Sequence, residues 1–227
     1  MPALSVEQAL YQRRSTRQFI NKSIPRKLLE KILIDARQAP SGANLQPGFV
    51  KVLEGKALQQ LSEKLCAAFD NGETQTEEYS YFPKPLPDYL KTRQRTVGYG
   101  LYNSLNIARR DIAGRKQQHR KNFEFFSAPV GLIITIERQM GKGCFMDMGM
   151  FIQSILLAAT AEGVATCGIG ALASYSTIIR QQLKLPDNEI VVCGMAMGYA
   201  DPQAPENQLI TERAALSEYV EFIDSGD

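Results

Sequence analysis

The chain has 227 residues, of which 44% are hydrophobic and 22% charged, and 26 Lys and Arg against 24 Asp and Glu leave a net charge of +2. That length can bury the core of one globular domain without disulfides. The balanced charge and the apolar content exclude intrinsically disordered, acidic-tail and strongly basic nucleic-acid-binding proteins.

The first predicted elements are two helices. Ser5 and Gln8 have the spacing of a capping box, so a helix is expected to run from there to about Arg14. A second helix is expected to begin near Pro25, because proline is favoured in a first turn, and to end before Pro40. Its apolar residues recur on one face, which is typical of a helix that packs on a core.

A turn-rich loop over 40–47 separates these helices from a predicted strand over 49–53 and a helix over 56–68. Residues 70–88 are polar and aperiodic and contain three prolines. So long a segment without periodicity predicts a lid-like insertion over about 70–95.

The second half of the chain alternates helical and strand patterns. Apolar residues over 97–112 recur at helical spacing, and 130–136 is a β-branched run typical of a buried strand. Residues 144–162 form a helix that is apolar nearly all round, which predicts a position in the middle of the core. A helix over 175–183 and a strand over 190–197 follow.

The last apolar residues, over 216–222, predict a short strand at the end of a polar tail. No internal repeat or linker divides the chain, so residues 1–227 are expected to form a single domain. Helices outnumber strands and do not alternate with them regularly. The fold class is therefore expected to be α+β, with helices flanking a small central mixed sheet.

Few residue types needed for protein-based redox or metal chemistry are present. The single histidine, His119, disfavours catalytic triads and multi-histidine metal sites, so no metal is expected and the chemistry is expected to come from a bound group. The most apolar stretch, 151–161, is too short to cross a bilayer. The cysteines Cys66, Cys144, Cys167 and Cys193 are widely spaced with no C-x-x-C pair, which predicts a reducing, cytoplasmic setting. Cys167 and Cys193 lie in apolar surroundings and are expected to be inert core thiols.

Charge is unevenly distributed along the chain. Residues 13–37 carry eight bases and two acids, 91–121 carry nine bases and one acid, and 200–227 carry seven acids and one base, Arg213. The densest group is 13–17, with three arginines and two hydroxyls at a predicted helix end. Guanidinium forks with hydroxyls suit a phosphate, although arginines there could equally complement the helix dipole.

Two further patterns have two readings each. Residues 168–173 match the G-x-G-x-x-A dinucleotide fingerprint, but a glycine-rich turn that lets backbone approach a flat ligand is the favoured reading. Tyr79, Tyr81 and Phe82, near the expected lid, could stack on an aromatic substrate or, as we favour, tether the loop.

Taken together, several segments resemble the FMN-dependent nitroreductase family over nearly the whole chain, and most closely its subgroup that reduces nitrobenzoate-type aromatics. Their order and separation carry the likeness. They are residues 13–19 (RRSTRQF), 39–47 (APSGANLQP), 125–129 (FFSAP), 147–163 and Arg213.

The resemblance implies a homodimer with FMN at the subunit interface. Arg13, Ser15 and Arg213 would hold the FMN phosphate, with Arg14 flanking it. Arg17 would lie near the flavin N1 and C2 carbonyl, where a cation stabilises the charge of reduced flavin.

The remaining implied contacts come from loops. The flavin ring would be lined from the partner chain by Pro40, Ser41, Gly42 and Asn44. Gly170 and Ala171 would offer a backbone amide to flavin N5, the atom that accepts hydride, so no side chain is expected to be a catalytic acid or base. The tail strand is expected to be exchanged across the dimer.

The activity implied is two-electron, ping-pong transfer of hydride from NAD(P)H to a small nitroaromatic or quinone-type acceptor. Two departures from the family pattern affect substrate shape and phosphate affinity: Gly48 replaces an aromatic residue, and Thr211 a basic one. Arg93 and Arg95 could bind an acidic substrate or belong to a solvated face.

Three other functions remain open at this point. The same fold could serve a flavin-dependent dehalogenase or a flavin-fragmenting enzyme. The chain could be a non-catalytic flavin-binding module whose basic stretch 91–121 meets an acidic partner. It could also be a Rossmann NAD protein built on residues 168–173.

Overall fold

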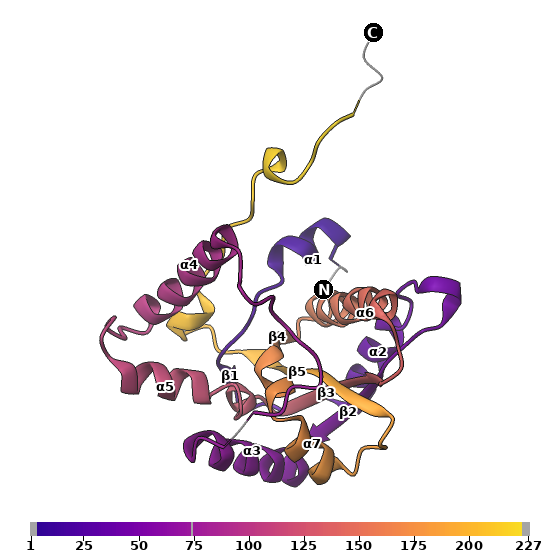
Figure 1. Ribbon diagram of the computed structural model, residues 1–227, viewed down its shortest axis with the longest axis horizontal. Coiled ribbons are helices and arrows are strands. Elements are labelled where there is room, and N and C mark those ends of the chain that lie inside the picture. The colour runs from indigo at the N-terminus through magenta and orange to yellow at the C-terminus, as the bar shows by residue number, and fades with distance from the viewer. Residues whose placement is uncertain (1–3, 74, 224–227) are drawn as a thin grey trace.

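The computed structural model describes residues 4–73 and 75–223. The ends of the expected 1–227 domain, and Thr74 within the expected lid, lie outside the described residues. A five-stranded sheet forms the centre of the described chain (Figure 1). Its strands are β1 (Phe19–Ile20), β2 (Phe49–Glu54), β3 (Val130–Glu137), β4 (Ala165–Ile169) and β5 (Glu189–Ala200).

The sheet is organised around β5, which pairs with β1, β3 and β4, while β2 pairs with the other edge of β3. All four of these ladders are antiparallel, whereas the sequence predicts a mixed sheet. Parallel pairing within the described residues is confined to the isolated bridges Ser15–Thr166 and Thr76–Tyr175. A fully buried strand has a continuous run of apolar residues, and this run does not indicate the direction of the strand relative to its neighbours. The sequence therefore could not distinguish an antiparallel sheet from a mixed one.

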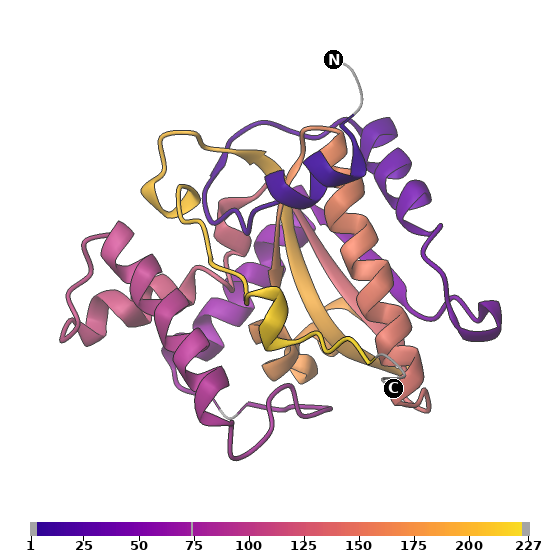
Figure 2. The ribbon, with the colours of Figure 1, turned by 90° about the horizontal axis from the view of Figure 1, so that it is seen from above.

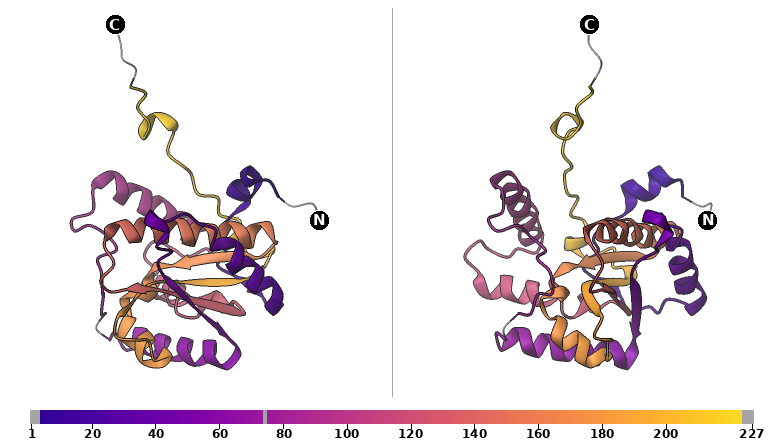
Figure 3. Two further views of the ribbon diagram at one scale, coloured as in Figure 1. Left: turned by 90° about the vertical axis from the view of Figure 1, so that its right-hand side faces the viewer. Right: turned by 45° about the vertical axis from the view of Figure 1, so that its right-hand side comes forward.

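Helices cover both faces of the sheet. In Figures 1 and 3, α2 and α6 lie on one face and α3 and α7 on the other, while α4 and α5 lie at one side of the domain. The α-helices are α1 (Val6–Gln12), α2 (Arg26–Ala36), α3 (Gly55–Asp70), α4 (Asp88–Ser104), α5 (Ile112–Arg120), α6 (Lys142–Ala161) and α7 (Ser176–Leu183). Short 3₁₀ turns are η1 (Gly42–Asn44), η2 (Phe125–Ser127), η3 (Gly170–Ser174), η4 (Pro205–Asn207) and η5 (Leu216–Glu218).

The alternation of side-chain direction along β3 explains why helices pack on both faces of the sheet in three layers. Leu132, Ile134 and Ile136 enter the core shared with α2 and α6, and Ile133 enters the opposite core with α3 and α7. Successive side chains of a strand point to opposite faces, so one apolar strand can support two cores. The α+β expectation is confirmed, and the predicted strand over 130–136 agrees with β3.

The capping box that begins α1 is also confirmed. The Gln8 N–H donates to Ser5 Oγ at 3.1 Å, and the Ser5 N–H donates to Gln8 Oε1 at 2.8 Å. The helix ends at Gln12, two residues before the predicted end.

The helix predicted over 97–112 is wrong as a continuous element. α4 ends at Ser104 and α5 begins at Ile112. Asn106 adopts a left-handed conformation with φ 55°, which ends the first helix. Asp111 then accepts the Gly114 N–H at 2.8 Å and caps the second helix. The apolar period continues across a break that it cannot detect.

The prediction that the helix over 144–162 lies in the middle of the core holds for one face only. Met148, Phe151, Ile155 and Ala159 of α6 are buried, whereas Met146 is 72% exposed. Among the described residues, α6 is the one helix long and apolar enough to cross a membrane by length and composition. Its buried face packs on the sheet and α2, and its apolar residues Met146 and Met150 are exposed in the single chain.

The strand predicted over 216–222 is wrong for the single chain. Leu216–Glu218 form the turn η5, in which the Ala215 N–H donates to Glu218 Oε1 at 2.9 Å. The segment leaves the body of the domain (Figures 1 and 3), with Tyr219, Phe222 and Ile223 exposed. A strand needs a neighbour for its backbone hydrogen bonds, and this part of the described chain has none.

Candidate functional site

A cavity of about 230 Å³ brings together both ends of the chain. The segment that leads to the C-terminus passes between α1 and α4, as Figure 2 shows from above. Four guanidinium groups and two hydroxyls converge there. The lining residues are Arg13, Arg14, Ser15, Arg17, Val97, Leu209, Thr211 and Arg213. We call this the arginine cavity.

The backbone of residues 15–18 is fixed from two sides. The Thr16 N–H donates to the Thr166 carbonyl of β4 at 2.9 Å. The Arg17 N–H donates to Asn207 Oδ1 at 2.8 Å, and Asn207 Nδ2 donates to the Gln18 carbonyl at 2.8 Å. Asn207 is 190 residues from Arg17 in the sequence, so no local pattern could have predicted this contact.

The arginine cavity is electrostatically suited to an anion. Burial lowers the pKa of Arg13, and the neighbouring charges of Arg213 and Arg14 lower it further. None of the described lining residues carries a carboxylate. A bound phosphate would relieve this mutual repulsion and accept charge-assisted hydrogen bonds from the guanidinium groups.

The position of Arg14 is compatible with both hypotheses for the arginine group, helix-dipole complementation and anion binding. Its Nη1 donates to the Tyr11 carbonyl at 2.7 Å, at the C-terminal end of α1, while the residue also lines the arginine cavity. Arg213 Nη1 donates to Thr211 Oγ1 at 2.7 Å and to the Thr211 carbonyl at 3.0 Å. These two hydrogen bonds direct the Arg213 side chain toward the backbone of its own tail segment and fix the Nη1 donor.

The loop over 40–47 does not line the arginine cavity of its own chain. In Figure 1 it lies beside α6, on the side of the domain away from α4. The Gly42 N–H donates to both carboxylate oxygens of Asp147 at 3.3 Å, and the Gln46 N–H donates to Ser41 Oγ at 2.8 Å. Pro40, Ser41, Gly42 and Asn44 are therefore brought together with one another but not with the arginines.

Gly170 and Ala171 begin η3, directly after β4. A Cβ on Gly170 would lie 3.0 Å from the ring of Tyr81, so a larger residue here would require that ring to shift. Neither residue lines the arginine cavity.

The segment between α3 and α4 is tethered, in contrast to the free excursion that its composition suggests. The Thr76 N–H donates to the Ser174 carbonyl at 2.8 Å, and the Tyr79 hydroxyl donates to the Val192 carbonyl. Loop tethering, the favoured reading of the aromatic group, is thus confirmed for Tyr79.

Glu78 is the charged centre of this tether. It accepts hydrogen bonds from Arg138 Nη2 at 2.7 Å, Arg180 Nη2 at 2.9 Å and the Val191 N–H at 3.0 Å. Burial raises the pKa of the Glu78 carboxyl, but the hydrogen bonds from Val191, Arg138 and Arg180 outweigh it and leave the pKa below its ordinary value.

Comparison with known proteins identifies the family. The model of the nitroreductase family matches residues 10–199, most of the chain. The chain belongs to the nitroreductase family. The resemblance seen in the sequence is therefore confirmed.

Individual nitroreductases match nearly the full length. The chain is 35% identical to a chloronitrobenzene nitroreductase of Comamonas testosteroni, over 96% of each chain. It is 36% identical to a 4-nitrobenzoate reductase of Pseudomonas putida, covering 93% of this chain and 92% of the relative. The solved FMN and NADPH-dependent nitroreductase NfnB of Sphigopyxis sp. strain HMH superposes with a TM-score of 0.94 at 38% identity, over 97% and 100% of the two chains.

The Rossmann reading of residues 168–173 is wrong for this nitroreductase. That fingerprint requires a parallel β-α-β unit, whereas β4 pairs antiparallel with β5. Gly168 lies within β4 and Gly170 opens a 3₁₀ turn, so the glycine-rich turn is the reading that the structure supports.

Most cations of the basic stretch over 91–121 are engaged by side chains within the domain. Four of its nine bases form ion pairs and three others lie over aromatic rings. The ion pairs are Lys91–Asp88, Arg93–Glu218, Arg120–Asp70 and Lys121–Glu206. The cations over rings are Arg109 on Tyr99, Arg115 on Tyr102 and Lys116 on Phe69. These internal contacts count against a broad basic surface for an acidic partner. Arg93 is engaged by its ion pair with Glu218, whereas Arg95 is exposed.

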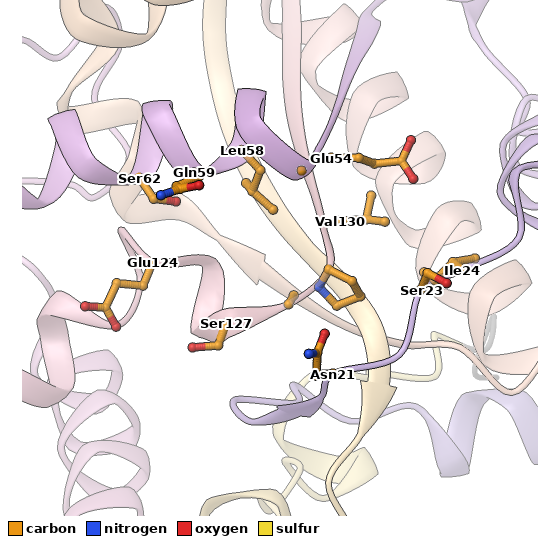
Figure 4. A pocket seen from close by; sticks show the side chains of 13 residues that line it. Asn21, Ser23, Ile24, Glu54, Leu58, Gln59, Ser62, Glu124, Ser127 and Val130 are labelled. Atoms are coloured by element: carbon orange, nitrogen blue, oxygen red, sulfur yellow. The ribbon is translucent and has the colours of Figure 1, made fainter.

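A larger cavity lies elsewhere, at the N-terminal end of α3 (Figure 4). It measures about 480 Å³, and none of its described lining residues is cationic. Its two carboxylates are already paired, Glu54 with Arg26 at 3.0 Å and Glu124 with Arg120. It therefore lacks the charge that a phosphorylated cofactor requires, and the arginine cavity is the better candidate.

The thiols do not offer competing chemistry. Burial raises the pKa of Cys66 and Cys167 to about 11 and that of Cys193 to about 12. All four cysteines are free. Within residues 4–73 and 75–223, no group of three or more His, Cys, Asp or Glu side chains could hold a metal ion.

Proposed function

We propose that this chain is an FMN-dependent NAD(P)H oxidoreductase that reduces nitroaromatic or quinone-type acceptors. The observation that carries the proposal is the arginine cavity, in which guanidinium groups from both ends of the chain meet without a lining carboxylate. Its donor set fits a phosphate monoester. Arg13, Ser15 and Arg213 would hold that phosphate and Arg14 would flank it.

Arg17 is proposed to support the reduced cofactor. Its backbone is fixed by Asn207, and its guanidinium shares the arginine cavity with the phosphate-binding residues. When bound, FMN supplies two-electron hydride chemistry, with NAD(P)H as donor and the aromatic acceptor as recipient in ping-pong order. A fixed cation near the flavin N1 and C2 carbonyl stabilises the charge that reduction creates.

The site is proposed to be completed by a second copy of the chain. α1 and α6 pack on each other and leave Val6, Tyr11 and Met146 exposed by 72% or more. Such apolar surface on neighbouring elements favours a homodimer. In that dimer the partner would contribute the loop with Pro40, Ser41, Gly42 and Asn44 to the flavin ring.

Two other parts of the proposal concern the backbone and the tail. Gly170 and Ala171 would present a backbone amide to flavin N5, beside the ring of Tyr81. The exposed apolar tail would cross to the other subunit and add a strand there, which would bury Phe222 and Ile223. With four free thiols, we place the enzyme in the cytoplasm.

The test is purification followed by spectroscopy and turnover. The purified protein is expected to be yellow and to oxidise NADPH in the presence of 4-nitrobenzoate, with reduction of the nitro group to a nitroso or hydroxylamino group. Arg13→Ala should weaken FMN retention, whereas Arg17→Ala should mainly slow flavin reduction. A protein that takes up no FMN would refute the assignment. With a chlorinated nitroarene as a second acceptor, a product that keeps its nitro group but loses the chloride would indicate a dehalogenase.

A further inference from the structure

The loop over 41–48 has an unusually strained backbone. Ala43, Asn44 and Gln46 have φ of 48°, 56° and 48°, and Gly48 has φ of 94°. Residues other than glycine rarely adopt this left-handed region, because Cβ comes too close to the following carbonyl oxygen. Several such residues within six positions persist only where surrounding contacts hold them.

Arg37, the residue that follows α2, supplies such contacts to the second half of the loop. Its Nη1 donates to the carbonyls of Gln46 at 3.1 Å and Pro47 at 3.4 Å, and its Nη2 donates to the carbonyl of Gly48 at 3.0 Å. One planar group thus holds three consecutive carbonyls. A lysine ammonium, which is a single point of charge, cannot reproduce this fork.

The guanidinium of Arg37 is itself fixed by α6. It lies over the ring of Phe151 at 4.0 Å from the centroid, which is a favourable cation–π distance. One turn earlier on α6, Asp147 accepts the Gly42 N–H. The loop is therefore held at one end by Arg37 on α2 and at the other by Asp147 on α6.

We propose that Arg37 is a positioning residue for the flavin site of the neighbouring subunit. Arg37 holds the 41–48 loop in its left-handed conformation, and this loop contacts the neighbouring flavin site. This inference rests on the proposed function, in which Ser41, Gly42 and Asn44 line the partner's flavin. Arg37 does not touch the cofactor. It acts by keeping the backbone of that loop in one geometry, so that the loop loses little freedom when the cofactor binds.

The first test measures flavin release from the holoenzyme by the recovery of flavin fluorescence. Arg37→Met removes all three hydrogen bonds, and release is expected to quicken by about tenfold or more, the effect of losing at least one charge-assisted bond. Arg37→Lys keeps the charge and the stem over Phe151, and is expected to lie between Arg37→Met and the wild type. Arg26→Met is the matched control, because Arg26 lies on the same helix and its one ion pair among the described residues is with Glu54 on the surface. It should change release less than twofold.

A purely structural role makes a different prediction. It would lower the Tm of Arg37→Met and Arg37→Lys but leave flavin release unchanged well below that Tm. That result would overturn the inference. The Lys variant keeps the test valid if the Met variant does not fold.

A mixed dimer tests whether Arg37 acts across the interface. One subunit carries Arg13→Ala and the other Arg37→Met. If the loop acts on the partner, one site receives both lesions and the other receives none, so half of the flavin should be released at the wild-type rate. If the loop acts on its own subunit, each site has one lesion and no wild-type phase remains, which would overturn the proposal. A wild-type protein that fails to bind FMN refutes the proposed function itself, whereas a flavin-bound wild type indistinguishable from Arg37→Met refutes only the role of Arg37.

Discussion

The Asn207 side chain links the tail to the backbone of Arg17 and Gln18, and its removal should measurably lower the stability of the protein. Asn207→Ala deletes the acceptor of the Arg17 N–H and two donated bonds, to the carbonyls of Gln18 at 2.8 Å and Asp201 at 3.0 Å. At roughly 0.5–1.5 kcal/mol each, and with partial exposure favouring the lower half, the loss is about 2 kcal/mol. For a chain of this length, that lowers the Tm by about 4–8 °C.

The effect on function should be selective. The deleted contact fixes the backbone of Arg17, which is proposed to support reduced flavin, whereas Arg13 and Arg213 keep their own positions in the arginine cavity. Stopped-flow reduction of the bound flavin by NADPH should therefore slow more than flavin release quickens. Asn207→Asp keeps the acceptor but places a carboxylate against two carbonyl oxygens, so it should be at least as destabilised as the alanine variant.

Asn122→Ala is the matched control for these measurements. Asn122 donates one exposed hydrogen bond, to the carbonyl of His119 at 2.7 Å, and does not line the arginine cavity. If Asn207→Ala unfolds within about 1 °C of this control, or slows flavin reduction and quickens release to the same degree, the reasoning is refuted, since a typical surface change is worth less than about 0.5 kcal/mol.

Three further predictions follow from single contacts. Glu78→Gln should free the segment before α4 and make it sensitive to limited proteolysis. The folded pKa of Glu78 is lowered, so the stabilisation from its carboxylate is present above the ordinary glutamate pKa and is lost as the pH falls through the folded pKa. The free energies of urea unfolding of the wild type and the variant should therefore converge only in acid. Gly170→Ala should displace the ring of Tyr81, 3.0 Å from the new Cβ, and raise the KM for a nitroaromatic more than it alters FMN content. Gly48→Ala places a Cβ 2.2 Å from the Sδ of Met148 at φ 94°, and should lower stability by about 1–3 kcal/mol in thermal unfolding.

Controls are available on the same elements. Glu77→Gln removes an exposed neighbouring carboxylate, and a proteolysis pattern equal to that of Glu78→Gln would contradict the tether. In α6, a Cβ on Gly143 meets nothing within 4 Å, so Gly143→Ala should be neutral or stabilising. A Gly48→Ala variant as stable as Gly143→Ala would show that Met148 moves aside without cost. An unchanged KM in Gly170→Ala would mean that Tyr81 does not face the acceptor.

Local features of the fold could be predicted from the sequence where neighbouring residues determine them. The capping box of Ser5 and Gln8 and the apolar run that became β3 depend on residues within one turn or one strand. The break between α4 and α5 could not be predicted, because the left-handed turn at Asn106 leaves the apolar period intact. The 216–222 segment has the composition of a strand, but strand formation depends on a neighbour that the single chain does not provide.

Part of the candidate site could also be predicted from the sequence, and part could not. The arginine group over 13–17 was visible as a cluster, and the family resemblance implied Arg213. The contacts that hold the cluster in place were not visible, because Asn207 and Thr166 meet it only in three dimensions. The apparent surplus of positive charge over 91–121 was misleading for the same reason: Glu218 and Glu206, its neutralising partners, lie about a hundred residues away.

The arginine cavity joins residues made at very different times during synthesis. Arg13 precedes Arg213 by 200 positions, and at ribosomal rates of roughly 5–20 residues per second this separates them by on the order of 10–40 s. All five strands are complete before Arg213 emerges. If FMN binds in the arginine cavity as proposed, its loading is a late event in biogenesis, and the nascent polypeptide then reaches its native topology before a phosphate compensates these positive charges.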